Sequence, residues 1–108
     1  MGGFADDPRR PAIDETVISW PEVRGKQVFG HRGWVRGRTM FGFIADDGVA
    51  IKLVAPIDAE ELLGREGVAL FTYAGRPMNG WAVVPVRDDP DMQAVVELLH
   101  AAYESVSG

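Results

Sequence analysis

The sequence predicts an α+β fold: a single antiparallel β-sheet of about five to six strands, packed against a long C-terminal helix and a short N-terminal helix. Three observations support it. Runs of β-forming residues fill most of the chain between residues 27 and 86. The segments joining them are too short for the crossovers that parallel strands need. The last segment repeats its apolar residues at the 3.6-residue spacing of a helix.

The N-terminal part is predicted to be a leader followed by a helix. Residues 1–11 (MGGFADDPRRP) are rich in Gly, Pro and charge, which favours a flexible leader, so the folded domain is expected over residues 12–108. Asp14 then serves as the N-cap of a short helix. Pro21 ends it, because the residue before a proline avoids the helical region.

The middle of the chain is predicted to form strands. Residues 27–30 and 33–35 are two short extended runs separated by a turn at His31 and Arg32. Residues 39–45 (TMFGFIA) and 49–54 (VAIKLV) flank Asp46-Asp47-Gly48, the residue types of a tight hairpin turn. These two runs therefore form a hairpin.

The second half of the chain adds a small helix and further strands. Asp58 caps a helix that ends at Leu63 and Gly64. Residues 68–73 and 81–86 are strands, and Pro85 indicates an edge position or a strand end.

The C-terminal segment is predicted to be the long helix. Asp89 is its cap and Pro90 its first residue. Its apolar face comprises Met92, Val95, Val96, Leu99, Ala102, Tyr103 and Val106.

Composition excludes several kinds of chemistry. The chain has 108 residues, enough for one domain, and no cysteine, so it has no disulfide, thiolate metal site or cysteine nucleophile. Its two histidines are far apart in sequence, and no serine lies in a nucleophile elbow. We therefore predict no catalytic residues, no metal and no cofactor. The sequence has no signal peptide and no apolar run long enough to span a membrane, so we expect a cytoplasmic location.

The charge distribution leaves two interpretations open. A net charge of −5 disfavours contact with phosphate backbones, yet residues 21–54 carry six basic residues against three acidic ones. Aromatic residues Phe29, Trp34, Phe41 and Phe43 are interleaved with them. The segment is either a stacking platform for a single strand or an apolar inner face with basic residues outside, and we favour the second. The candidate contacts for a nucleic acid or another anion are Lys26, His31, Arg32, Arg36, Arg38 and Arg76.

Several short motifs occur in a recognisable order. They are Phe29-Gly30, the run from Gly37 to Phe41, Lys52 in a strand, and the segment GRPMNGW. This order resembles the TfoX N-terminal domain family of the YjbR (MmcQ-like) superfamily, over residues 20–106. The resemblance implies a compact α+β domain with a central antiparallel sheet. It also implies a link to regulation of natural competence, a DNA-binding label and no defined catalytic set.

The most specific motif also has an interpretation from its residues alone. Glycines at 75 and 80 permit sharp turns, Pro77 fixes a loop, and Trp81 can hold that loop on the core. Arg76 would then be presented to an anion or a carboxylate. We favour a structural role for this segment, which comprises Gly75, Arg76, Pro77, Met78, Gly80 and Trp81.

Three functions follow from these observations. The leading hypothesis is a non-enzymatic binding or regulatory module, acting through protein contacts in transcriptional regulation. The second is a nucleic-acid-binding protein that uses a basic hairpin surface. The third is a small-molecule-binding domain or an enzyme without a recognisable motif. A deep pocket that holds Arg76 and Trp81 beside an acid of perturbed pKa would favour it. We expect an unidentified protein partner, or a homodimer formed through an edge strand, and no membrane partner.

Overall fold

The computed structural model describes residues 4, 7–28 and 30–106, and it confirms the α+β prediction. Six strands form one antiparallel sheet in the order β1-β2-β3-β4-β6-β5. The strands are β1 (Val23–Val28), β2 (His31–Arg36), β3 (Thr39–Ile44), β4 (Val49–Lys52), β5 (Ala69–Tyr73) and β6 (Arg76–Val84). The helices are α1 (Arg9–Ile18), α2 (Ala59–Leu63) and α3 (Asp89–Ser105).

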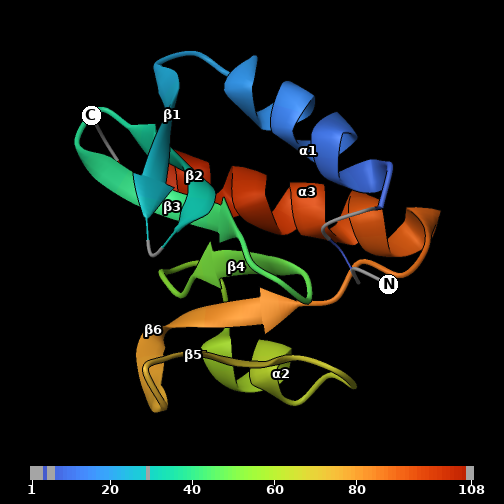
Figure 1. The fold of residues 1–108 in the computed structure, drawn as a ribbon. Helices are drawn as coiled ribbons and strands as arrows, with labels where there is room; N and C mark the ends of the chain where they lie inside the picture. The colour runs from blue at the N-terminus through green and yellow to red at the C-terminus, as the bar shows by residue number, and fades with distance from the viewer. Residues whose placement is uncertain (1–3, 5–6, 29, 107–108) are drawn as a thin grey trace.

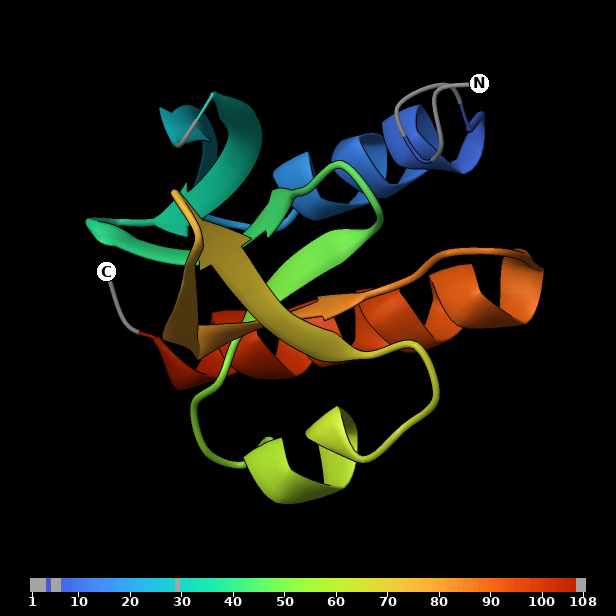
Figure 2. The same ribbon diagram turned by 60° about the horizontal axis from the view of Figure 1, so that its bottom comes forward.

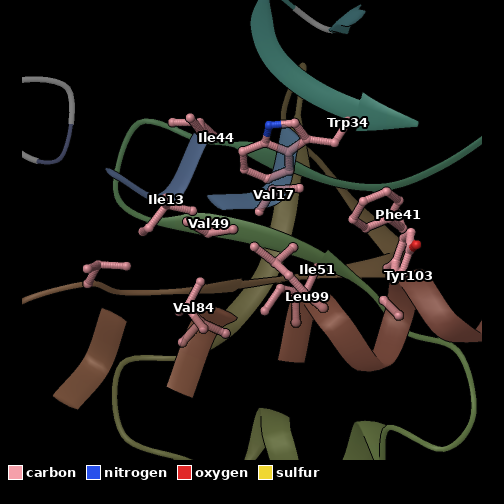
Figure 3. Close-up of a cluster of buried hydrophobic side chains, with 14 of the residues drawn as sticks. Ile13, Val17, Trp34, Phe41, Ile44, Val49, Ile51, Val84, Leu99 and Tyr103 are labelled. Atoms are coloured by element: carbon pink, nitrogen blue, oxygen red, sulfur yellow. The ribbon is translucent and has the colours of Figure 1, made fainter. Parts of the chain in front are cut away.

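The two longer helices cover one face of the sheet. Helices α1 and α3 pack against each other, and α3 lies against β3 and β4 (Figure 1). The main core between helices and sheet includes the fully buried Ile13 and Val17 of α1 and Leu99 of α3. Figure 3 shows these side chains meeting Trp34, Phe41, Val49 and Ile51 from the sheet. The spacing of Val95, Leu99 and Ala102 is what places them on the covered side of α3.

The sheet is strongly curved, and its concave face is the one away from α1 and α3. Four strand spacings separate β2 from β5 in the sheet order, which is about 19 Å in a flat sheet. The rings of His31 on β2 and Phe71 on β5 are nevertheless only 6.2 Å apart. Figure 2 shows how β5 crosses in front of the sheet. This curvature buries Phe43, Ala50 and Phe71 in a second, smaller apolar cluster without a covering helix.

An irregularity in β3 separates two aromatic residues that a regular strand would place on one face. The β2–β3 register shifts so that Trp34 pairs with Gly42 while Val35 pairs with Met40, leaving Phe41 as an extra residue. Such a bulge breaks the alternation of side chains. Phe41 consequently packs in the main core and Phe43 in the smaller cluster.

The structure corrects the predicted N-terminal elements. Helix α1 begins at Arg9, inside the predicted leader, and Asp14 lies in the middle of the helix instead of capping it. Ile13 and Val17 are fully buried, so packing against the core extends the helix toward the N-terminus beyond what local capping signals indicate.

The first hairpin also differs from the prediction. Val28 pairs with His31, so His31 and Arg32 belong to β2, and Gly30 lies in the turn before it. Gly30 has a φ of +77°, a conformation that favours glycine. The expected turn at His31 and Arg32 was therefore wrong, whereas the turn at Asp46-Asp47-Gly48 between β3 and β4 is confirmed.

The predicted loop at Gly75-Arg76-Pro77 is mostly strand. The turn consists of Ala74 and Gly75, both with positive φ, and β6 starts at Arg76. Pro77 is tolerated because this end of β6 pairs only with β5, so its missing N–H faces no second strand. Pro85 follows the last residue of β6, which confirms a strand end; the strand itself is internal in the sheet.

The remaining helices agree with the prediction except at one cap. The side chain of Asp58 accepts the backbone N–H of Glu61 at the start of α2. In α3 the capping side chain is that of Asp88, one residue before the expected Asp89, and it accepts the N–H of Asp91. Pro90, predicted as the first residue of the helix, is therefore its second residue and lies in the first turn.

Candidate functional site

The structure separates the six predicted contact residues: four lie on the two opposite faces of the sheet and two lie at turns. Arg32 and Arg36 point toward the helices, where they contact Asp14 of α1 and the last turn of α3. Lys26 pairs with Gly33 and Val28 with His31, and paired residues share a face, so Lys26 and His31 lie on the side away from the helices. The other two lie at turns, Arg38 between β2 and β3 and Arg76 at the start of β6. They do not form one basic surface.

The predicted stacking platform is not available at three of its four aromatic residues. Trp34 and Phe41 are fully buried in the main core, and Phe43 is fully buried in the smaller cluster. Phe29 lies outside the described residues. For Trp34, Phe41 and Phe43 the structure thus supports the interpretation as apolar core residues.

Arg36 holds the end of α3. Its Nη1 donates to the carbonyl oxygens of Tyr103 at 2.9 Å and Val106 at 3.2 Å, and its guanidinium lies 4.4 Å from the centre of the Tyr103 ring. Its Nε donates to Glu22 at 3.2 Å. These bonds occupy the side chain in the fold, so Arg36 is a structural residue.

Arg32 is held in a different way, by a carboxylate that also binds a buried indole. Asp14 Oδ1 accepts from Arg32 Nε at 3.1 Å and from Trp34 Nε1 at 2.7 Å. The guanidinium lies directly over Gly25 on β1, where a methyl group would overlap it. Among the described residues, no acceptor is bonded to the terminal nitrogens Nη1 and Nη2, and about two fifths of the side chain is exposed, at 39%.

Arg32 lines a cleft between α1, the β1–β2 hairpin and the β3–β4 turn. The cleft has a volume of about 560 Å³, within the range of small-molecule sites. Its walls combine apolar surface from Pro11, Ile44 and Ala45 with several polar groups. The polar side chains that line it are Arg10, Asp14, Gln27, His31, Arg32 and Asp46.

His31 occupies a sheltered position at this cleft. Its ring stacks on Phe43 with centroids 6.0 Å apart, and its Nδ1 lies 4.0 Å from a carboxylate oxygen of Asp46. The predicted contact residue thus belongs to β2 and packs on the smaller apolar cluster. His100, the other histidine, lies on α3 with its Nδ1 3.5 Å from a carboxylate oxygen of Glu104.

Sequence reasoning missed two further features of the basic residues. Lys52 Nζ lies 5.4 Å from the centre of the Trp81 ring, on the face away from the helices. In addition, none of the six described strands contains Asp or Glu. Their basic residues are Arg24, Lys26, Arg32, Arg36, Lys52 and Arg76. These six basic residues thus lie in the strands and the described acidic residues lie outside them, a pattern that becomes visible only once the ends of each strand are known.

The GRPMNGW segment is part of the sheet. Gly75 makes the expected turn, but Gly80 lies within β6 and has no positive φ. Trp81 packs 5.1 Å from the ring of Phe43, in the smaller cluster and not under a loop. Neither Arg76 nor Trp81 lines the cavities of about 560 and 380 Å³, so neither cavity is the pocket that would have favoured a ligand site at these two residues.

The shifted pKa values belong to a different region, around the start of α3. Hydrogen bonds from the side chain and the backbone N–H of Arg87 lower the pKa of Asp91. The carboxylate of Asp89 raises the pKa of Arg9, and Asp91 raises that of Arg87. Arg9 and Asp89 form an ion pair between the starts of α1 and α3, and Arg87 and Asp91 form a second ion pair at the start of α3.

Two other kinds of site are not found in the described part of the chain. Residues 4, 7–28 and 30–106 contain no group of three or more His, Asp or Glu side chains placed to hold a metal ion. In the same residues, no helix has both the length and the apolar character of a membrane span.

Comparison with known proteins identifies a family. Residues 38–102 match the luciferase domain family, whereas no curated protein and no solved structure matches the chain significantly. The match spans β3 to most of α3, which is more than half of the chain. Most of the cleft's polar side chains, including Arg10, Asp14 and Arg32, lie before it. The extent of the match establishes that this chain belongs to the luciferase domain family.

Proposed function

We propose that this domain is a non-enzymatic binding module that takes a small molecule into the cleft between α1 and the β1–β2 hairpin. The observation that carries the proposal is the cleft itself. It combines a volume of about 560 Å³ with apolar walls and a few converging polar groups, the usual composition of a ligand site.

The experiment is a fragment titration followed by two-dimensional ¹H–¹⁵N NMR on the whole chain. We expect bound fragments to shift the backbone amides of Gln27, Arg32 and Ala45 together, because these residues line the cleft from three different segments. Fragments that shift only other regions, or no fragment that shifts this set, would contradict the proposal.

A variant that fills the cleft sharpens the test. Gln27 is exposed and lines the cleft, so Gln27→Trp should block binding with little cost in stability. Lys26→Trp is the matched control, since Lys26 is also exposed on β1 but points to the opposite face. Equal loss of binding in both variants would indicate a general effect on the fold.

Nucleic-acid binding is a second candidate, favoured by the absence of acidic residues from the described strands. On the face away from the helices, Lys26, Lys52 and Arg76 have no carboxylate partner among the described residues. Binding of labelled single-stranded or duplex DNA should then weaken steeply between about 50 and 200 mM salt. Lys26→Gln with Lys52→Gln should abolish it, whereas Arg65→Gln with Arg87→Gln, which removes surface ion pairs elsewhere, should not.

A regulatory role through protein contacts completes the proposal. The resemblance to the TfoX N-terminal domains supports a cytoplasmic regulator, and its most specific segment, GRPMNGW, lies inside the matched region. The sheet also ends in two edge strands, β1 and β5, which could pair with another chain or a second copy. Sedimentation equilibrium should detect a dimer if the partner is a second copy of this chain. A monomer at all concentrations would reject the homodimer.

A further inference from the structure

We infer that the ligand of this cleft carries a carboxylate or phosphate group, and that Arg32 is the residue that binds it. The inference rests on the proposed function, since it concerns the same cleft. It deepens that proposal by assigning the chemistry of recognition to one guanidinium and by naming the groups that hold it in place.

The first step is that Arg32 has a fixed orientation. Asp14 accepts the Nε–H of Arg32, and the same carboxylate oxygen is bound by the N–H of the fully buried Trp34. Asp14 is therefore anchored to the core, and through it the guanidinium is anchored as well. A guanidinium fixed in this way loses less conformational entropy when it binds a ligand.

The second step is that β1 leaves room for the guanidinium. Gly25 pairs with Trp34 on the neighbouring strand, and its missing side chain is where the guanidinium lies. Its φ is not positive, so the backbone alone does not require glycine here. The absence of a side chain at Gly25 thus allows Arg32 to lie flat against β1.

The third step is that the binding end of Arg32 remains available at the cleft. The two terminal nitrogens have no hydrogen-bond acceptor among the described residues, and Arg32 lines the cleft wall. A planar guanidinium offers paired N–H donors that match a carboxylate or phosphate. Arg10 lines the same wall and has no ion pair within the described part of the chain. Its guanidinium is therefore a second positive charge that can contact an anionic ligand in the cleft.

The charge balance of the cleft predicts how binding should depend on salt. Asp14 and Asp46 offset the two arginines, so the cleft has little net field. Recognition must then come from the geometry of the guanidinium more than from long-range attraction. Binding should weaken only slightly between about 50 and 200 mM salt, unlike binding to a nucleic-acid backbone.

The test compares benzoate, phenyl phosphate and the neutral benzamide, which share one aromatic ring. In ¹H–¹⁵N spectra the indole N–H of Trp34 and the Nε–H of Arg32 both report on Asp14. We expect at least one anionic probe to shift both signals and to bind about tenfold or more tightly than benzamide. Whichever anion binds better distinguishes a carboxylate ligand from a phosphate ligand.

Two variants make the result decisive. Gly25→Ala should displace the guanidinium at constant charge and reduce anion affinity about tenfold, and Arg32→Lys should do the same by removing the paired donors. Gly80→Ala is the matched control, because nothing lies within 4 Å of a Cβ added there. The inference is wrong if Gly25→Ala and Arg32→Lys bind the anions as tightly as the unaltered chain does. It is also wrong if the unaltered chain binds benzamide as tightly as it binds the two anions. Neutral fragments that still bind in the cleft would leave the proposed function intact, whereas failure of all probes and fragments would reject both.

Discussion

The indole N–H of Trp34 donates to Oδ1 of Asp14 over 2.7 Å, and this bond joins the second strand to the first helix. Trp34 is fully buried, so its N–H has no access to water. Asp14 satisfies this donor and orients Arg32 at the same time. One carboxylate therefore connects the core to the candidate binding site.

Loss of that carboxylate should destabilise the domain. We expect Asp14→Ala to lower the free energy of unfolding by about 2–3 kcal/mol, because a buried N–H is left without an acceptor. Asp14→Asn keeps an acceptor oxygen and should cost less. Urea unfolding followed by tryptophan fluorescence measures both, with the exposed Glu15→Ala as the control on the same helix. Equal stability of Asp14→Ala and Glu15→Ala would show that the bond contributes little.

A methyl group at Gly48 should be far more costly than one at Gly80. A Cβ at Gly48 would overlap the carbonyl oxygen of Val84 and lie 2.8 Å from its carbonyl carbon, and backbone atoms cannot rotate away. We expect Gly48→Ala to cost about 2–3 kcal/mol through overpacking. Gly80→Ala meets nothing within 4 Å and should change stability by less than about 0.5 kcal/mol. Thermal or urea unfolding compares the two, and similar midpoints would contradict the packing of β4 against β6.

Removal of the Arg36 side chain should loosen the end of α3. The last turn of this helix has no basic residue of its own, and Arg36 Nη1 supplies donors to two carbonyl oxygens there. We expect Arg36→Gln to cost about 1 kcal/mol and to speed amide hydrogen exchange in residues 103–106 several-fold. Arg38→Gln alters an exposed turn residue and serves as the control. Unchanged exchange in Arg36→Gln would show that the turn is held by packing alone.

The pair formed by Arg87 and Asp91 should make stability depend on pH at acidic values. The Arg87 hydrogen bonds lower the pKa of Asp91 in the folded chain, so the unfolded chain takes up the proton first as pH falls. The pair therefore stabilises the fold above about pH 4, and this contribution disappears as pH falls through the lower folded-state pKa.

The variant Asp91→Asn tests this sign. It should be less stable than the unaltered chain at neutral pH by about 0.5–1 kcal/mol, and the difference should vanish as pH falls through the lowered folded-state pKa of Asp91. Glu97→Gln, at an exposed position on the same helix, is the control. Urea unfolding at several pH values measures the difference, and a gap that stays constant down to pH 2 would contradict the assigned pKa shift.

The sequence by itself determined the elements whose signals are local. The turn residues at 46–48 specified the β3–β4 hairpin, the Asp58 side chain marked the start of α2, and the apolar spacing from Val95 to Tyr103 marked the buried face of α3. In each case the determining interaction links residues within a few positions of one another. The fold class followed from these elements and the short connections between them.

The tertiary structure alone decided where the site lies. The cleft joins side chains from α1, β1, β2 and the β3–β4 turn, and Arg32 depends on Asp14, eighteen residues away in sequence. The bulge at Phe41 and the contact between His31 and Phe71 arise from strand register and sheet curvature. Such contacts form between segments distant in sequence, so the basic residues that looked like one group along the chain lie on opposite faces of the folded sheet.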